Sequence, residues 1–173
     1  MYNWSGKFDW IPDHASVETE NNLKHHITYP NLPQRILKAR DSLMSHFRPI
    51  LNHFGVTEQQ WRILRALDEH GKLEPRELCD MCQISSPSMA GILSRMEEVE
   101  LIERDGIPGD QRRVIVHLSR KGTRLLSKIG PLIDKQYAYL EQACGKQIFT
   151  DLFSVLDKFI DLKNRPVKQV DLP

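Results

Sequence analysis

The chain has 173 residues, of which 40% are hydrophobic and 27% charged, a balance typical of a globular domain with an ordinary core. The formal net charge is only +1, which excludes a general excess of basic residues, so any surface that binds nucleic acid must be a local patch. No segment approaches the roughly 20 consecutive apolar residues of a membrane-spanning helix, and the first residues lack the basic start and apolar core of a signal peptide. We therefore expect a cytoplasmic protein that makes no contact with a membrane.

Residues 1–32 form an extension without clear periodicity. It contains Trp4 and Trp10, two of the three tryptophans, together with Phe8 and Ile11. Disordered tails contain few aromatic residues. The extension is therefore either a loose arm or an arm whose aromatic side chains dock on the body of the protein or on a partner subunit.

A long helix is expected over residues 33–54, because apolar residues recur there with the helical period. Pro49 lies inside this segment and predicts a kink, since proline cannot donate a backbone hydrogen bond. Arg40 falls among the apolar positions, between Leu37 and Met44. A cation there needs a partner, because an unpaired buried charge is costly.

Two shorter helices are predicted next. Thr57 and Gln60 have the spacing of a capping box, which starts a helix that Gly71 ends. Pro75 opens the second helix, because proline fits a first helical turn. With the helix that follows, this segment forms a helix-turn-helix pair.

The second helix of this pair is expected to have Ser86 as its cap and Pro87 in its first turn. One face is apolar and consists of Met89, Ile92, Leu93 and Met96. The opposite face carries small, hydroxylic or basic side chains, namely Ser88, Ala90, Gly91, Ser94 and Arg95. Such side chains allow close approach to base edges and phosphates in a major groove.

A β-hairpin is expected to follow, with strands at residues 101–104 and 114–118. Asp105-Gly106 and Pro108-Gly109-Asp110 supply turn residues between them. Basic residues gather around the helix and the hairpin, at Arg95, Arg104, Arg112, Arg113, Arg120, Lys121 and Arg124. A helix followed by a basic hairpin is the order of a winged helix-turn-helix.

Helical segments within residues 120–163 precede a tail at 164–173, and Pro131 predicts a second kink. The last helix has a wide apolar stripe of Ile148, Leu152, Val155, Leu156, Phe159 and Ile160. Residues 33–54 and 120–163 therefore have more apolar surface than one chain can cover, which a homodimer would bury.

Two motifs carry a family resemblance. Residues 110–119, DQRRVIVHLS, follow the pattern D-x-R-x-x-x-V-x-L-T with serine in the last position, and residues 57–64 read TEQQWRIL. Over roughly residues 33–163, the chain resembles the MarR family of bacterial transcription regulators. ARDSLMSHFRPIL and SPSMAGILSRME, at residues 39–51 and 86–97, look most like the branch of homoprotocatechuate-operon repressors.

The resemblance implies a mainly α-helical winged helix-turn-helix with a small β-hairpin wing. Residues 33–54 and 120–163 would form the homodimer, and residues 55–119 would bind double-stranded DNA at a pseudo-palindromic operator. Arg112, oriented by Asp110, would enter the minor groove, while Arg95 and Arg113 would contact phosphates. The expected DNA-binding residues are Arg76, Ser86, Pro87, Ser88, Ala90, Gly91, Ser94, Arg95, Asp110, Arg112 and Arg113.

The branch also implies control of aromatic catabolism by a small aromatic carboxylate or its thioester. Arg40 could bind the carboxylate with two hydrogen bonds, and Trp61 could stack on the ring. His46 and Arg65 are second contacts in this hypothesis. Alternatively, Trp61 is a core residue and Arg40 pairs with an acid across the dimer.

The chain departs from the family pattern in two places. Ala90 and Gly91 stand where relatives often carry longer polar residues, which leaves fewer hydrogen bonds to bases, and Glu100 stands where many members have the glycine that ends the recognition helix. Glutamate tolerates a left-handed backbone poorly, so we expect this helix end to have a different shape.

Three other interpretations are considered. Cys79 and Cys82 form a C-x-x-C that could sense thiol oxidation, although buried core cysteines are the first expectation. Zinc could be sensed by His46, His53 or His117, although no carboxylate cluster adjoins them. An enzyme is not expected, since the sequence has no glycine-rich phosphate loop and no nucleophile elbow. We expect no cofactor and no bound metal.

Overall fold

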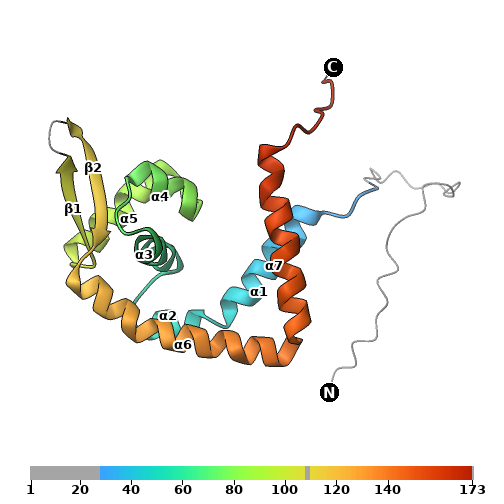
Figure 1. Ribbon diagram of the computed structural model, residues 1–173, viewed down its shortest axis with the longest axis horizontal. Helices are drawn as coiled ribbons and strands as arrows, with labels where there is room; N and C mark the ends of the chain where they lie inside the picture. Colours follow the sequence, from blue (N-terminus) through green and yellow to red (C-terminus); the bar gives the residue numbers. More distant parts are fainter. Residues whose placement is uncertain (1–27, 108–109, 173) are drawn as a thin grey trace, which may run out of the picture.

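The computed structural model describes residues 28–107 and 110–172, and the side chains it describes exclude those of residues 107–112. In chain order it contains α1 (Leu32–Ser45), α2 (Arg48–His53), α3 (Glu58–His70), α4 (Pro75–Cys82), α5 (Ser86–Glu98), β1 (Ile102–Ile107), β2 (Asp110–Leu118), α6 (Arg120–Cys144), α7 (Lys146–Ile160) and the short 3-10 helix η1 (Asp161–Asn164). The predicted fold class, mainly helical with one antiparallel hairpin, is confirmed (Figure 1). Within the described residues, no helix is both long enough and apolar enough to cross a membrane.

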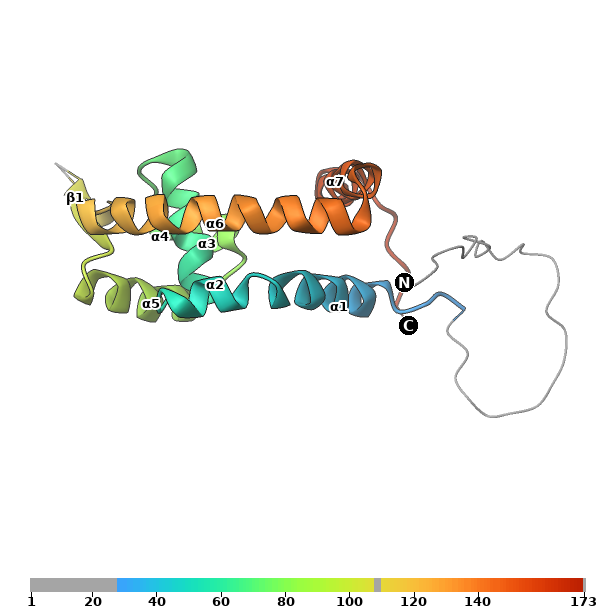
Figure 2. The same cartoon turned by 90° about the horizontal axis from the view of Figure 1, so that it is seen from below.

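Helix α6 connects the two ends of the molecule. Figure 1 shows the hairpin and α3 to α5 on the side where α6 begins, α2 beside the middle of α6, and α7 with α1 toward its other end. Seen from below, α5, α2 and α1 follow one another in a row, and α6 runs alongside them (Figure 2). A movement of the terminal helices can therefore reach the hairpin end of the molecule through one continuous helix.

The core lies in the lobe formed by α2 to α5 and the hairpin, with α3 near its centre (Figure 1). Side chains that are less than 2% exposed come from α2 to α6 and both strands, and they are Leu51, Ile63, Leu64, Leu67, Leu78, Met89, Leu93, Met96, Ile102, Val116 and Ile129. Neither α1 nor α7 has a buried residue. Burial thus stabilises the lobe within one chain, whereas most apolar residues of α1 and α7 are exposed, and only Leu43 and Met44 at the end of α1 pack on the core.

The predicted helix starts are largely confirmed. Thr57 and Gln60 form both halves of a capping box at α3, and Gly71 ends that helix with φ +78°. Helix α4 begins at Pro75 as predicted. The expected cap of α5 was wrong by one residue, because Ser85 is the extended cap residue and Ser86 is already helical.

The predicted single helix over residues 33–54 was wrong, since the chain forms α1 and α2 with a break at His46 and Phe47. Pro49 lies in the first turn of α2, where its missing N–H leaves no hydrogen bond unmade. Phe47 at the break is only 3% exposed, and its ring packs 4.6 Å from that of Tyr137 on α6. By contrast, α6 continues through Pro131 as one helix.

The hairpin is longer than predicted. Asp105 and Gly106, expected in the turn, pair with Ile115 and Val114 as part of β1. Pairing continues to Ile107, which lies opposite Asp110, with an irregular register after Gly106. The expected turn residues Pro108 and Gly109 lie outside the described residues.

The end of α5 has the shape that glycine usually gives, so the expectation of a different helix end was wrong. Glu100 adopts a left-handed backbone with φ +60°. Its amide donates to the Glu97 carbonyl at 2.8 Å, and the Leu101 amide donates to the Met96 carbonyl at 2.8 Å. These two hydrogen bonds define a Schellman motif, which holds glutamate in this conformation despite a steric cost of about 1–2 kcal/mol.

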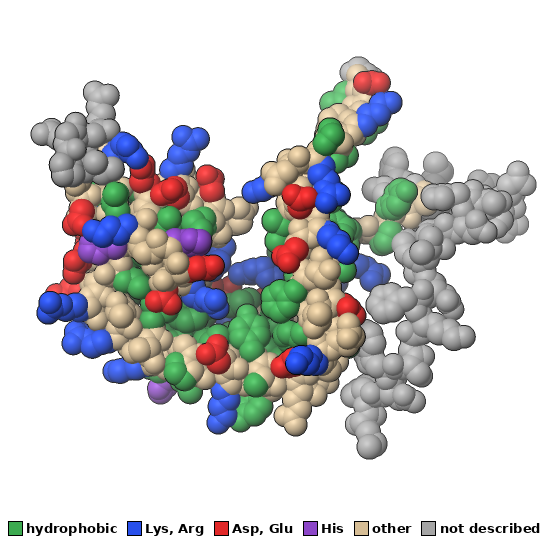
Figure 3. All heavy atoms as spheres, in the orientation of Figure 1, with side chains coloured by type: hydrophobic (Ala, Val, Ile, Leu, Met, Phe, Trp, Pro, Cys, Tyr) green, Lys and Arg blue, Asp and Glu red, His purple; other side chains and the backbone are tan. Residues whose placement is uncertain are grey.

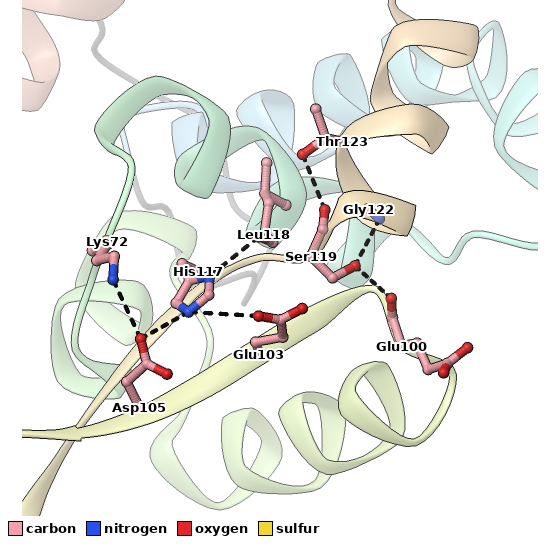
Figure 4. A network of polar contacts seen from close by, with 9 residues as sticks. All are labelled: Lys72, Glu100, Glu103, Asp105, His117, Leu118, Ser119, Gly122 and Thr123. Atoms are coloured by element: carbon pink, nitrogen blue, oxygen red, sulfur yellow. Dashed lines mark hydrogen bonds and ion pairs between the residues drawn. The ribbon is translucent and has the colours of Figure 1, made fainter.

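Ser119 joins this helix end to α6 (Figure 4). Its hydroxyl donates to the Glu100 carbonyl at 2.5 Å and accepts from the Gly122 amide at 2.9 Å. Its amide donates to the Leu101 carbonyl at 3.2 Å. The first turn of α6 therefore rests directly on the backbone that leads out of α5.

Gly122→Ala should destabilise the protein by about 1–3 kcal/mol, the usual cost of overpacking. A Cβ at this position would lie 2.1 Å from the carbonyl oxygen of Leu101, which is backbone and cannot rotate away. The free energy of unfolding in urea measures the loss. Gly130→Ala on the same helix is the control, because a Cβ there meets nothing within 4 Å; an equal loss in both variants would contradict the close contact.

Candidate functional site: a nucleic-acid interface and a neighbouring hollow

Helix α5 has the two faces that its sequence predicts. The apolar residues Met89, Ile92, Leu93 and Met96 are all at most 3% exposed. On the opposite face, Gly91 is half-buried and the remaining predicted DNA-binding residues are exposed, namely Ser86, Pro87, Ser88, Ala90, Ser94 and Arg95. The lobe therefore presents one side of a rigidly packed helix to solvent, with side chains small enough for close approach to a nucleic-acid groove.

Arg95 lies beside the smallest residue of this face. A Cβ added to Gly91 would be 3.5 Å from Nη1 of Arg95. The guanidinium therefore lies at ordinary van der Waals distance over Gly91, and it has the geometry to hold a phosphate with two hydrogen bonds.

The hydroxyl groups of α5 make local hydrogen bonds at its surface. Ser85 donates to the Ser88 hydroxyl at 3.0 Å, and Ser94 donates to Glu98 at 3.4 Å. The Cys79 thiol of α4 donates to the Ser86 hydroxyl at 3.7 Å. These contacts are weak or exposed, so the hydroxyls can exchange them for bonds to a ligand.

The hairpin is fixed to the lobe at its base. Leu73 in the α3–α4 loop pairs with Val116 of β2 through hydrogen bonds of 3.0 and 2.8 Å. Asp105 accepts from Lys72 at 3.3 Å and contacts His117 Nε2 at 2.9 Å (Figure 4). The hydrogen bonds from Lys72 and then His117 lower the pKa of the Asp105 carboxyl, so it stays ionised and keeps this network intact.

Two predicted arginines lie near α4. Arg76 is exposed on α4, and Arg113 of β2 forms an ion pair with Glu74, the cap residue of α4. Asp110 and Arg112 belong to β2, but their side chains lie outside the described residues, so the proposed insertion of Arg112 into a minor groove stays a prediction.

Arg40 has a carboxylate partner in its own chain. Its Nη2 lies 2.8 Å from Oε2 of Glu58, whose Oε1 accepts from Nε of Arg48 at 2.7 Å. Arg48 also pairs with Asp41. The cluster joins α1, α2 and the first turn of α3, and it gives Arg40 an acid partner within its own chain. Nothing in the sequence near Arg40 points to Glu58, which lies 18 residues further along the chain.

A hollow of about 470 Å³ lies between α3 and α6. Trp61 and Arg65 of α3 line it together with Asp68, Thr123, Leu126, Ser127, Gly130, Pro131, Ile133 and Asp134. Two of the four predicted effector-binding residues are thus brought together, whereas Arg40 and the exposed His46 are not part of the lining. Trp61 is only 9% exposed, so it is a core residue with one edge at the hollow.

The alternative sites receive no support in the described part of the chain. No group of three His, Cys, Asp or Glu side chains there could hold a metal ion, and His46, His53 and His117 lie in different elements. Cys82 is 4% exposed, and burial raises the pKa of its thiol, which disfavours the reactive thiolate. Cys79 is half-buried, so the expectation of a buried pair holds for Cys82 alone.

Comparison with known proteins places these features in context. The model of the MarR family matches residues 54–113. Over 132 residues the chain is 39% identical to the HTH-type transcriptional regulator FarR of Neisseria gonorrhoeae, covering 75% of this chain and 90% of that protein. It is 34% identical over 145 residues to the homoprotocatechuate degradative operon repressor of Escherichia coli, covering 84% of this chain and 97% of the repressor. The crystal structure of NadR in complex with 4-hydroxyphenylacetate superimposes with a TM-score of 0.68 and 34% identity, covering 83% of this chain and 97% of NadR.

Glu58→Gln should remove part of the stability that the protein has at neutral pH. Hydrogen bonds from Arg48 and then Arg40, opposed by burial, lower the pKa of Glu58 in the folded state. A lowered carboxyl pKa contributes stability above the unfolded pKa, near 4.5, and this contribution is lost as pH falls through the folded value.

The urea unfolding free energy of Glu58→Gln should therefore be lower than that of the natural protein by up to about 1 kcal/mol at pH ~7, and the difference should shrink toward pH ~3.5. Glu69→Gln is the control, an exposed acid on the same helix. A constant difference across this pH range would show that the carboxylate charge of Glu58 does not matter.

Proposed function

The chain belongs to the MarR family of transcription regulators, and we propose from this premise that it is a homodimeric repressor of an aromatic-compound catabolic operon, released from its operator by a small aromatic acid or its thioester. The DNA-binding part of this proposal rests on the exposed face of α5, whose opposite, apolar face is buried in the lobe.

In the proposed complex, each protomer inserts α5 into a major groove. The small residues Ala90 and Gly91 permit close approach, Ser86 and Ser88 reach base edges, and Arg95 holds a phosphate. Arg76 and Arg113 add positive charge from α4 and the hairpin, and Arg112 reads the flanking minor groove. The two-fold symmetry of a dimer requires a pseudo-palindromic site.

The proposed dimer buries the uncovered terminal helices. The apolar residues of α1 and α7 that are more than 40% exposed are Leu32, Ile36, Leu37, Ile148, Leu152, Phe153, Val155, Phe159 and Ile160. Figure 3 shows hydrophobic side chains gathered along the concave side of the molecule between the lobe and α7. A second copy of the chain that covers these residues would stabilise α1 and α7, which lack a core of their own.

The proposed effector site is the hollow between α3 and α6. An aromatic ring would lie beside Trp61, and the carboxylate would bind Arg65. Two relatives support an aromatic acid, since one is named for homoprotocatechuate degradation and NadR was crystallised with 4-hydroxyphenylacetate. Arg40 pairs with Glu58 in this structure, so the roles of Arg40 and His46 rest on the sequence alone.

Release of DNA requires that the ligand bind two arrangements of the dimer with different affinity. Helix α3 belongs to the lobe, whereas α6 continues to the terminal helices. A ligand held between them favours one spacing of the two lobes, and a coupling of about 1–3 kcal/mol is the usual size of such an effect.

Ser88→Ala and Arg95→Ala should weaken DNA binding in different ways. Ser88 lies in the first turn of α5, so its loss should change base preference at one operator position. Arg95 is assigned to a phosphate, so its loss should weaken all sequences alike and reduce the slope of log affinity against log salt by about one. Binding curves at several salt concentrations, on an operator selected from random DNA and on unrelated DNA, distinguish the two; identical behaviour of the variants would refute this division of roles.

Arg65→Ala should leave operator affinity near normal but raise the concentration of 4-hydroxyphenylacetate needed for release by about tenfold or more, because a charge-assisted hydrogen bond is lost. Arg40→Ala, measured in the same assay, tests the prediction made from sequence. Arg35→Ala is the control, an exposed cation on α1. Failure of 4-hydroxyphenylacetate and related aromatic acids to release the natural protein would reject the aromatic effector, and an unchanged response of Arg65→Ala would place the site elsewhere.

A further inference from the structure

A second hollow, of about 410 Å³, adjoins the first half of α6. Its apolar lining consists of Phe54, Val56, Val99, Leu101 and Leu125, with Gly55 between the first two. Its polar lining consists of three cations, Lys121, Arg124 and Lys128. The lining comes from the α2–α3 link, the end of α5 and α6, three segments that Figure 2 shows on the underside of the molecule.

The two hollows lie on opposite sides of α6. Residues 121, 124, 125 and 128 line this one, whereas residues 123, 126, 127, 130, 131, 133 and 134 line the one beside Trp61. At about 100° per residue, these two sets point in roughly opposite directions from the helix axis, with Pro131 between them. The second hollow is therefore separate from the proposed effector site.

The three cations share one face of α6, since they are three and four residues apart. Within the described part of the chain, neither Arg124 nor Lys128 has a salt bridge, and Lys121 lies 3.5 Å from Glu100 with both side chains exposed. Like charges at this spacing repel each other on a helix. A negative charge at their centre would relieve that repulsion.

The floor of the hollow is apolar and firmly held. Val56 and Leu101 are 3% and 7% exposed, and they belong to the core of the lobe. Val99 is 48% exposed beside the cations, an apolar side chain that a ligand could cover. An inorganic anion would leave this floor bare, so the lining matches a molecule with an apolar body and an anionic end.

We propose that this hollow is a second binding site, for a small organic anion with an apolar body, such as an aryl or short alkyl carboxylate. Its volume is in the range of about 300–1,000 Å³ of small-molecule sites, which are apolar with a few convergent polar groups. The anion binds between Arg124 and Lys128, and the apolar body lies on Val99 and Leu101. This site goes beyond the proposed function and does not depend on it.

The place of the site gives it a regulatory consequence. Val99 and Leu101 stand on either side of Glu100, which ends α5, and Phe54 to Val56 connect α2 to α3. A bound anion ties the end of α5 to α6 and to that connection. If the anion binds two positions of α5 with different affinity, it changes the affinity for whatever α5 binds, and that partner changes the affinity for the anion by the same factor.

The experiment is equilibrium dialysis of the full chain against 2-naphthoate, with the neutral 2-naphthalenemethanol in parallel. Arg124→Gln/Lys128→Gln should weaken binding of naphthoate at one site per protomer by about tenfold or more. The matched control is Arg120→Gln/Lys135→Gln, which removes the same charge from α6 outside the hollow. Any naphthoate that binds beside Trp61 does so equally in both double variants, so the difference between them reports on the second hollow alone.

Val99→Glu is an independent variant that puts a carboxylate into the hollow at an exposed position, and it should abolish the same site. The proposal is overturned if the three variants bind naphthoate alike, if the neutral alcohol binds as tightly as naphthoate, or if the control loses as much as Arg124→Gln/Lys128→Gln. It is also overturned if Arg124→Gln/Lys128→Gln binds naphthoate normally but lowers the slope of log DNA affinity against log salt by about two. That result would assign these cations to DNA phosphates.

Discussion

The first turn of α6 packs against bare backbone, and the rest of the molecule depends on that contact. Gly122 lies so close to the Leu101 carbonyl that no side chain fits between them, and Ser119 bonds both sides of the junction. Because α6 is also the helix that reaches α7, the contact sets where the lobe stands relative to the terminal helices. The exposed face of α5 is thus positioned through backbone hydrogen bonds at the last residues of the helix, and its side chains are left available for the DNA contacts that we propose.

A second connection joins the terminal helices to the lobe on the other side. Glu58 receives hydrogen bonds from Arg40 of α1 and Arg48 of α2, so the start of α3 is bound to both. Phe47, at the break between α1 and α2, packs on Tyr137 of α6. The ionic connection is partly exposed and sensitive to pH and salt, whereas the aromatic one is neither. The lobe is therefore attached by an ionic contact that varies with pH and salt and by an aromatic contact that does not. Both contacts help to position α3, which lines the hollow beside Trp61.

The sequence predicted most of the fold because local signals and tertiary packing agree in the lobe. The period of Met89, Ile92, Leu93 and Met96 identified the buried face of α5, and hence the exposed face, without any knowledge of its neighbours. Predictions failed at positions where the local sequence fits two structures about equally well. Ser85 and Ser86 are both good caps, and Asp105-Gly106 suits a turn as well as a strand. The apolar periodicity of residues 33–54 fits a single helix bent at Pro49. It does not indicate that one helix ends before Pro49 and a second one begins there.

The candidate sites were less predictable, because they depend on which helices face each other. Trp61 and Arg65 were identified from α3 alone, but the seven residues of α6 that complete their hollow follow only from tertiary packing. Glu58 was missed because its partners stand 18 and 10 residues away, across a helix break. Arg62 illustrates the same limit, since it is half-buried on α3, bonds the Cys82 carbonyl at the end of α4, and leaves its Nε without a partner among the described residues.

The left-handed Glu100 has a consequence for how such a protein changes over evolutionary time. The Schellman motif that holds it consists only of main-chain hydrogen bonds, so the bend after α5 does not depend on a glycine at this position. The steric cost of a non-glycine residue is a small part of the roughly 5–15 kcal/mol by which a domain is stable. The site can therefore drift from glycine to a charged residue and back while the fold stays the same. An exchange between glutamate and glycine adds or removes a carboxylate 3.5 Å from Lys121. A substitution that leaves the fold unchanged can therefore change the net charge at the base of the hairpin.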